Sequence, residues 1–375
     1  MSESPNGLRL ARREFIASSM AASALAIASD IFSIKTAFAA GPELASLDPV
    51  DPDIYFGTTG SYFGTWTDGN LRMSNNMPMM LTDVAHYGLQ GFEPYSGQVI
   101  QFLDNPAALK KMADAAGVVL IDVGDLPRRP ASPSPTGRPA IAAGGGSYPW
   151  LGEEGNAELI RDMVSFARDF LAPLGCDHWK TNMGARPPNG PSDAQLKGLA
   201  KTLNEIGRQT IAHGVRLSPH PHIWGPMERE HELRAVMDNT DPRYVWMILD
   251  TGHNVLGGMD PVEIVRDYSL RISELHLKDT FPKYRGNKST PTQVQHRQKS
   301  LYSSLGSGGV DFPAIFKVLR DRHFKGWAVL DMDAPRPGDG TGSVDDNLRR
   351  SITYLREKLG VKFASPPARG LFTDG

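Results

Sequence analysis

Ionisable side chains follow several short apolar segments of this sequence, at the point where each segment ends. Glu93 comes directly after Gly-Phe, and Asp250 and His253 lie in the run Leu-Asp-Thr-Gly-His. The other residues placed in this way are His220, His222, His276, Lys278, Asp279, Asp331 and Asp333. If the segments are strands of one parallel barrel, their carboxyl ends meet at one mouth, so these side chains converge although they lie far apart along the chain.

Imidazoles and carboxylates that converge are suitable ligands for a divalent cation, which takes N and O atoms at about 2.0 to 2.2 Å. Taking one ligand from each successive strand, we nominate His220, Asp250, His276 and Asp331 as the metal site. Taken singly, a strand-end Asp often caps the next helix and a His often bonds to a core carbonyl, but four together are harder to explain in that way. His220 and His222 share a side across the intervening proline, so which of them touches the metal stays open.

The spacing within two of these groups separates their roles. His276 and Lys278 are two residues apart, so on a strand both face the same side, one toward the metal and one toward the substrate. Asp250 and His253 straddle the end of their strand, which lets the carboxylate reach the ion while the imidazole reaches a hydroxyl of the ligand.

The elements that must position these residues alternate between two periodicities. Short β-branched or apolar runs, bounded by Gly, Pro or Asp, are followed by segments with 3.6-residue apolar spacing. The predicted strands are 54–58, 91–93, 118–123, 178–182, 216–220, 245–250, 272–276 and 328–331. The predicted helices are 74–87, 105–116, 156–174, 192–213, 228–237, 261–268, 311–323 and 343–359. Several helices begin at clear signals, which are Asn105-Pro106, Asp260-Pro261 and Pro191-Ser192.

Eight strand-then-helix units predict an α/β fold, the (β/α)8 TIM barrel, because parallel strands need helical crossovers. A doubly wound open sheet is the alternative. The sequence has no G-x-G-x-x-G after a first strand and no G-x-x-x-x-G-K-[ST], so the nucleotide-binding versions of that sheet lose their main support.

Composition excludes several other classes of protein. The 375 residues carry 40 basic and 42 acidic side chains, a formal net charge of −2 that supplies no general field for nucleic acid or an anionic membrane. The single cysteine, Cys176, allows neither an intramolecular disulfide nor a cysteine-based zinc cluster. The fold must therefore be stabilised by its core.

Residues 1–39 resemble a twin-arginine export signal. Arg12 and Arg13 precede a mild apolar stretch, and Ala37 and Ala39 supply the small residues that a signal peptidase needs. We expect cleavage after Ala39, with the twin-arginine translocon as a partner during export and a periplasmic or secreted protein as the product. An ordinary amphipathic helix or an uncleaved anchor is the alternative.

The remaining residues, 40–375, are expected to form a single domain with its core at about 52–360. Two long connections, 128–156 and 281–309, both follow predicted strands, so in a barrel they would be lids or rims of the catalytic face. The second has no acidic residue and carries Lys283, Arg285, Lys288, Arg297 and Lys299. These could clamp a phosphate or carboxylate. A solvated lid is at least as well supported, so no phosphate site is assigned.

With these motifs the sequence resembles the xylose isomerase-like TIM-barrel superfamily of sugar phosphate isomerases and epimerases, and within it the inosose dehydratase group. The similarity covers about residues 52–360. The residues that carry it are Gly91-Phe92-Glu93, His220-Pro221-His222 after Gly214-Val215, Leu249-Asp250-Thr251-Gly252-His253, His276-Leu277-Lys278-Asp279 after Arg271, and Gly309-Val310-Asp311-Phe312 leading to Gly326-Trp327.

The resemblance implies a metal-dependent enzyme that acts on a sugar or cyclitol carrying a carbonyl. A divalent ion, which could be Mn, Mg, Co or Zn, would stabilise the enediolate formed when a neighbouring proton leaves. His222, His253 and Glu93 are the candidate base and acid, and Lys278 would steady negative charge or donate a proton. Returning the proton gives isomerisation or epimerisation, whereas losing hydroxide gives dehydration.

Substrate binding is expected from Glu93, His253 and Lys278, together with an aromatic residue that stacks on a sugar ring. Trp66 is the first candidate for stacking, and Phe63 and Tyr95 are others. An aromatic residue near a strand end is, however, more often packed into the rim.

Two departures from the superfamily pattern leave the reaction open. Its epimerases have Glu at the fifth and eighth strand ends, where this sequence has His220 and Asp331. Histidine at the fifth position is as in inosose dehydratases. A non-catalytic periplasmic carbohydrate-binding protein is the main alternative. An AP-endonuclease-type phosphodiesterase is disfavoured by the near-neutral charge and the export signal, and no nucleic-acid partner is expected. The sequence does not determine the oligomeric state.

Overall fold

The structure is a computed structural model that describes residues 54–127, 150–152 and 157–362. The predicted export signal and most of the 128–156 connection lie outside the described residues. The strands are β1 (Ile54–Thr59), β2 (Gly64–Thr67), β3 (Asn70–Met73), β4 (Gly91–Glu93), β5 (Val119–Leu120), β6 (His178–Thr181), β7 (Arg216–Pro219), β8 (Met247–Asp250), β9 (Ile272–Leu277), β10 (Asp279–Thr280), β11 (Tyr302–Ser303) and β12 (Gly326–Leu330). The helices are α2 (Met77–His86), α3 (Ser96–Val99), α4 (Pro106–Ala116), α5 (Ala157–Phe166), α6 (Ala172–Leu174), α7 (Asp193–Thr210), α8 (Glu230–Met237), α9 (Thr251–Leu256), α10 (Pro261–Tyr268), α11 (Gln293–Gln298), α12 (Phe312–Asp321) and α13 (Val344–Leu359).

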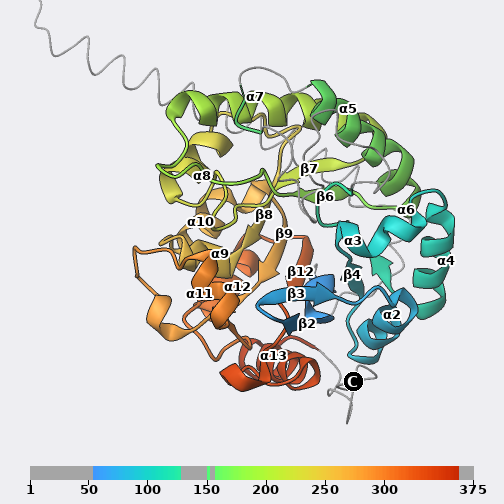
Figure 1. The fold of residues 1–375 in the computed structure, drawn as a ribbon, viewed down its shortest axis with the longest axis vertical. Helices are drawn as coiled ribbons and strands as arrows, with labels where there is room; N and C mark the ends of the chain where they lie inside the picture. Colours follow the sequence, from blue (N-terminus) through green and yellow to red (C-terminus); the bar gives the residue numbers. More distant parts are fainter. Residues whose placement is uncertain (1–53, 128–149, 153–156, 363–375) are drawn as a thin grey trace, which may run out of the picture.

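Parallel strands form the centre of the molecule and helices surround them, with α7, α5, α4, α2 and α13 along the outside (Figure 1). Six strands pair in the order β5-β4-β1-β12-β9-β8, and β6 pairs with β7. A parallel bridge from Leu217 to Val245 joins β7 to β8. The order around the sheet is that of a (β/α)8 barrel, which confirms the predicted fold.

The barrel closes between β5 and β6 largely through side chains. The Asp122 carboxylate accepts the Lys180 backbone N–H at 2.6 Å, and the Trp179 indole donates to the Val123 carbonyl at 2.9 Å. One step further, Asp125 accepts the backbone N–H of Asn182 at 2.9 Å. Because side chains make these bonds, the strand predicted at 118–123 is reduced to β5, which is only two residues long.

The lower interior of the barrel is apolar on one side. Ile121, Trp327 and Val329 form a separate buried cluster there, with Tyr55 and Val119 packed against it. Glycine at Gly57 and Gly91 makes the packing possible, since a Cβ at Gly91 would lie 2.5 Å from the Trp327 ring and one at Gly57 would lie 2.5 Å from Ile121. Side chains alternate between the two faces of β12, so after Trp327 and Val329 the next side chain that points into the barrel is that of Asp331, at the mouth.

The helices begin where the sequence predicts. The Asn105 and Asp260 side chains accept backbone N–H groups at the first turns of α4 and α10, and both helices have proline at the first position. Ser192 caps α7 in a capping box with Gln195. The sequence analysis did not predict the β2–β3 hairpin, α9, α11 or the β10–β11 pair. Within the described residues, no helix has both the length and the hydropathy that crossing a bilayer would require.

Residues 281–309 lie over the mouth of the barrel, as predicted for a connection that follows a strand. Their return to the barrel depends on Asp279 in β10, which pairs with Ser303 of β11. The Asp279 carboxylate accepts four backbone N–H groups at 2.9 to 3.1 Å, from Thr280, Gly306, Gly308 and Val310. Burial raises the pKa of Asp279 to about 6, although these N–H groups favour the ionised form. Asp279 is therefore a structural anchor of this connection.

We expect Asp279→Asn to destabilise the protein by about 2–4 kcal/mol, because the new amide nitrogen would face two backbone N–H donors that then lose their acceptor. Chemical denaturation measures this change. The matched control is Asp114→Asn. The Asp114 side chain is 60 % exposed and pairs with Lys110, so this substitution should change the free energy of unfolding by less than about 0.5 kcal/mol. Equal effects of the two substitutions would contradict the anchoring role.

Candidate metal and catalytic site

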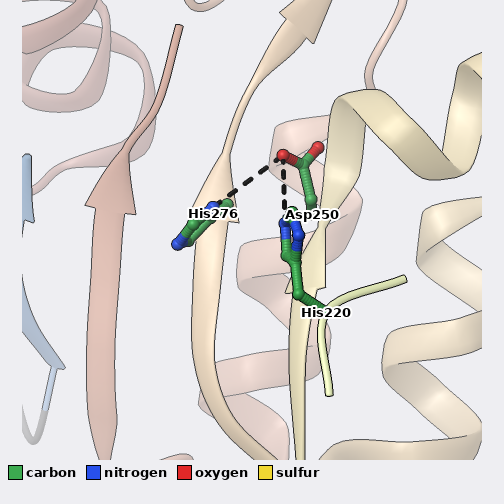
Figure 2. A group of neighbouring side chains, drawn as sticks. All are labelled: His220, Asp250 and His276. Atoms are coloured by element: carbon green, nitrogen blue, oxygen red, sulfur yellow. Dashed lines mark ion pairs between the residues drawn. The ribbon is translucent and has the colours of Figure 1, made fainter. Parts of the chain in front are cut away.

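Asp250, at the end of β8, uses its two carboxylate oxygens for different purposes. Oδ1 accepts the backbone N–H of His253 at 2.7 Å and so caps α9. Oδ2 is buried and has no hydrogen-bond partner among the described residues. It faces His220 Nε2 at 3.7 Å and His276 Nδ1 at 3.9 Å, as Figure 2 shows. The capping role and the metal-binding role that the sequence suggested are therefore compatible.

The donor set around Asp250 Oδ2 fits a divalent cation. His220 Nε2 and His253 Nε2 are also buried without a hydrogen-bond partner among the described residues, and His253 Nε2 lies 3.4 Å from Asp250 Oδ2. Two ligand atoms that each lie about 2.1 Å from one ion are about 3.0–3.4 Å apart, so these separations need only a small contraction. Two imidazole nitrogens and one carboxylate oxygen, from His220, His276 and Asp250, suit a borderline or hard divalent ion.

His276 is held by carboxylates on both sides of its ring. Nε2 lies 2.7 Å from Glu93 Oε2 and 3.1 Å from Glu274 Oε1, and Nδ1 lies 3.2 Å from Asp331 Oδ2. Burial by itself lowers the pKa of His276, but the carboxylates, Glu93 above all, outweigh burial and raise this pKa well above its usual value. Without an ion both ring nitrogens therefore carry protons, and Nδ1 would have to lose its proton to coordinate one, while Nε2–H still donates to Glu93.

Asp331 lies beside this group at the end of β12. Its Oδ1 accepts hydroxyl hydrogen bonds from Thr59 and Ser61, both at 2.8 Å. Its Oδ2 faces His276 Nδ1 and also Lys278 Nζ, at 3.1 Å. Burial raises the pKa of Asp331, but the two cationic neighbours, Lys278 first, lower it well below its usual value. Asp331 is therefore ionised and rigidly held, beside rather than among the three residues that surround Asp250 Oδ2.

Three further imidazoles at the mouth are kept neutral. Burial lowers the pKa of His220 and of His253 well below the usual range, and it lowers the pKa of His222 to about 4. The rings of His222 and His253 are 3.7 Å apart between centroids. His220 Nδ1 is 2.9 Å from Asn182 Oδ1, which leaves Nε2 directed at Asp250. His220 is thus the one of the two predicted histidines that faces Asp250 Oδ2.

Lys278 supplies a fixed positive charge at the site. Its Nζ contacts Asp331 Oδ2 at 3.1 Å and Asp333 Oδ1 at 3.0 Å, and it lies 4.3 Å from the centre of the Tyr302 ring. Burial alone would lower its pKa, but the carboxylates of Asp331 and Asp333 raise it well above the usual value. Lys278 therefore remains protonated next to His253, whose Nδ1 lies 3.4 Å from the Tyr302 hydroxyl.

A second polar layer, which the sequence analysis missed, supports His276 from below. His178 Nε2 lies 2.7 Å from Glu274 Oε2, and His178 Nδ1 lies 2.6 Å from Asp177 Oδ1. Lys180 Nζ lies 2.5 Å from Glu93 Oε1. Glu274 and His276 are two residues apart on β9, as His178 and Lys180 are on β6, so the alternation that paired His276 with Lys278 could have found them.

The connection 281–309 covers the site with aromatic side chains. His296 Nε2 bonds to Asp333 Oδ2 at 2.9 Å, and the His296 ring contacts Tyr302 and Trp66 at 5.6 and 5.1 Å between centroids. The Trp66 indole donates to the carbonyls of Asp333 and Ala334 at 3.1 and 2.9 Å. The Trp66 contacts in the structure are thus with the rim, and its stacking on a substrate stays a prediction.

Two other candidates make contacts within the protein that the sequence analysis did not expect. Phe63 belongs to the hydrophobic core and packs against Phe92, with the ring centroids 5.8 Å apart, so its contacts are with core residues. Glu93 has both oxygens engaged, by Lys180 and by His276, so its contacts orient His276 rather than face an open cavity. The basic residues of 281–309 do not converge: the Lys288 ammonium, for example, donates to the Gly258 carbonyl, and Lys283 lies over the rings of Phe281 and Tyr284.

Replacing Asp250 by Asn should abolish metal binding and leave the fold intact, because Asn still caps α9 but is a far weaker ligand. We expect MnCl2 at about 100 times the dissociation constant to stabilise the unaltered protein by about 2.7 kcal/mol, measured as a rise in melting temperature together with bound manganese. Asp250→Asn should lose both signals. Asp260→Asn, which alters the exposed cap of α10, should retain both. A full manganese response in Asp250→Asn would contradict the assignment.

The same variant has a pH signature in the metal-free protein. Burial raises the pKa of Asp250 to about 7 from 3.8, so the folded chain keeps a proton that the unfolded chain releases. Stability should therefore fall as the pH rises from about 4 to about 7, by an amount on the order of a few kcal/mol, and Asp250→Asn should lack this component. Saturating metal should remove the loss, because a cation favours the ionised carboxylate.

Comparisons with known proteins agree with this architecture. Residues 81–358 match the family described as xylose isomerase-like TIM barrel. An inosose dehydratase of Clostridium botulinum is 30% identical over 168 residues, which are 44% of this chain and 54% of that protein. This chain thus matches about half the length of that relative.

Solved structures of the same fold cover more of the chain. A sugar phosphate isomerase/epimerase from Parabacteroides distasonis has a TM-score of 0.57 at 19% identity, over 85% of this chain and 98% of that one. A 3-keto-D-glucoside 4-epimerase from E. coli has a TM-score of 0.55 at 17% identity, over 81% and 99%. At these identities the likeness concerns the fold alone. Because the family match extends over residues 81–358, most of the sequence, the chain belongs to the xylose isomerase-like TIM barrel family.

Proposed function

We propose that this protein is a metal-dependent isomerase, epimerase or dehydratase of a sugar or cyclitol that carries a carbonyl. The observation that carries the proposal is the group of His220 Nε2, His253 Nε2 and Asp250 Oδ2, three buried polar atoms that converge without hydrogen-bond partners among the described residues. A protonated lysine and neutral imidazoles adjoin them. The names of the relatives, an inosose dehydratase and sugar epimerases, support this class of substrate.

His220, Asp250 and His276 would hold the ion, with Asp331 next to them as a further candidate ligand. When bound, a divalent ion polarises a carbonyl oxygen and so makes the neighbouring C–H more acidic. Glu93 and Glu274 would act as positioning residues, because Glu93 accepts from the far nitrogen of His276 and Glu274 Oε1 lies 3.1 Å from that nitrogen.

His253 and His222 are the proposed proton carriers. Both imidazoles are neutral at pH 7, since burial lowers the pKa of each, so either has a lone pair available to accept a proton. His253 lies against both Asp250 and Tyr302, and the His222 ring lies next to it at a tilt, 3.7 Å away between centroids. Two adjacent imidazoles provide one group to take the proton and a second to return it to another atom.

Lys278 would stabilise the negative charge that develops on the substrate oxygen. Its high pKa makes it a lasting positive charge rather than a ready proton donor. Asp331 and Asp333 hold the ammonium in place, and Tyr302 covers it. Because the flanking groups are imidazoles and not a pair of glutamates, loss of a hydroxyl after proton removal is as compatible with this site as return of the proton.

NMR in D2O tests the proposed reaction. Keto-inositols and 3-keto-glucosides incubated with the protein should lose the signal of the proton next to the carbonyl, either with conversion or as exchange alone. The exchange should vanish on chelation and in His276→Ala, and it should fall at least about 100-fold in His253→Gln, which removes a proton carrier.

His231→Gln is the matched control, because that side chain is 76 % exposed and lies outside the site. The His231→Gln variant should catalyse exchange of the substrate proton at the same rate as the unaltered protein. Binding of these ligands with no exchange at any pH would instead support the non-catalytic carbohydrate-binding alternative.

We also propose that residues 1–39 direct export through the twin-arginine route and are removed. Because that route requires the arginine pair, changing Arg12 and Arg13 together to Lys should retain the protein in the cytoplasm with its N-terminus intact. Cell fractionation and N-terminal sequencing measure both effects. Normal export and processing of the double variant would refute the proposal.

A further inference from the structure

A polar cavity opens beside the site, on the same face of the barrel. Its volume is about 610 Å³, within the range of roughly 300–1,000 Å³ that is usual for small-molecule sites. Three connections line it: 186–190 after β6, 224–229 after β7, and 290–294 after β10, within the connection 281–309. The cavity thus lies on the catalytic face of a TIM barrel but outside the buried histidine cluster.

Trp224 is the wall that the cavity shares with the site. Its indole ring lies 5.9 Å from the His222 ring and 5.7 Å from the His296 ring, between centroids. Its φ of 66° is a left-handed conformation that a tryptophan rarely adopts. Two bonds hold it there, from its backbone N–H to Glu228 Oε2 and from its indole N–H to the Pro291 carbonyl, both at 2.7 Å. The two hydrogen bonds offset the energetic cost of this backbone conformation, and they fix an aromatic ring at the boundary between cavity and site.

Both arginines that line the cavity are held in ion pairs. Arg186 contacts Glu232 at 2.5 Å and Glu228 at 3.6 Å, and Arg229 contacts Glu228 at 3.2 Å. Glu228 also lines the cavity, whereas Glu232 is buried behind it, so both guanidinium groups are already engaged by carboxylates and are less available to a phosphate or carboxylate ligand. The cavity suits a neutral molecule.

Two amides at the cavity are available to such a molecule. The side chains of Asn189 and Gln293 are exposed and make no hydrogen bond within the described part of the chain. An amide offers both donors and an acceptor, which matches a hydroxyl, and an aromatic ring packs against the apolar face of a sugar. Amides, a fixed tryptophan and paired charges together are the chemistry that recognises a carbohydrate ring.

We propose that this cavity binds a second, neutral sugar ring, so that the substrate is a glycoside or disaccharide rather than a free monosaccharide. The inference rests on the proposed function for its reaction: the ring that carries the carbonyl occupies the histidine site. The second ring lies against the cavity face of Trp224, between Asn189 and Gln293. The cavity therefore defines the size of substrate that the enzyme prefers.

Binding to the unaltered, metal-containing protein tests the subsite without requiring turnover. Isothermal titration would compare glucose, a set of neutral α- and β-linked glucose disaccharides, and glucose 6-phosphate. At least one disaccharide should bind about tenfold more tightly than glucose, and glucose 6-phosphate should show no advantage over glucose. The variant Asn189→Ala/Gln293→Ala should reduce the ratio of disaccharide to glucose affinity by roughly fivefold to tenfold, because losing two hydrogen bonds removes most of the advantage of the second ring.

Gln298→Ala is the matched control, because Gln298 is an exposed glutamine of the same helix, α11, but does not line the cavity. It should leave the ratio unchanged. The proposal is overturned if no disaccharide binds more tightly than glucose, if the phosphate is preferred, or if the double variant keeps the unaltered ratio. Absence of proton exchange with every keto sugar, while the disaccharide preference persists, would overturn the proposed reaction and not this subsite.

Discussion

The site depends on one unfavourable arrangement, a carboxylate oxygen that is buried among nitrogen atoms and accepts no hydrogen bond from the part of the chain that the structure describes. Asp250 Oδ2 has nitrogen atoms of His220, His253 and His276 within 3.4 to 3.9 Å. Leaving a buried polar atom in this condition is costly unless something compensates for it. A divalent cation held by His220, Asp250 and His276 would compensate for it, which is why the donor set is more informative than any single residue in it.

The rest of the interior can be understood as support for that arrangement. The barrel carries its polar residues in two layers, with Glu274 and Glu93 between His178 and Lys180 below and His276 above. Each carboxylate is shared between a cation of the lower layer and the His276 ring. This sharing keeps several buried charges paired, and it orients the imidazole whose other nitrogen faces Asp250.

The cover of the mouth makes the site dry and also extends it. His296 and Tyr302 seal the histidines, and Trp224 separates them from the open cavity. A dry site strengthens the interaction of Lys278 with any negative charge on a substrate. Under the proposed function, the cavity beside it would add selectivity for the part of the substrate that does not react.

Much of this protein could be read from the amino-acid pattern alone, because strand alternation and helix capping are local properties. The strand ends at Asp250 and His276, the caps at Asn105 and Asp260, and the position of Lys278 on the same side as His276 all follow from spacing of a few residues. Parallel strands connected by helices then allow few topologies other than a barrel.

Which atoms meet across the barrel could not be read in the same way. Four features depend on strand register, ring orientation and packing between residues up to 183 positions apart. His220 rather than His222 faces Asp250, and Glu93 orients His276. Phe63 belongs to the core, and side chains join β5 to β6. Contacts over such separations are set by closure of the whole barrel, so no local periodicity encodes them.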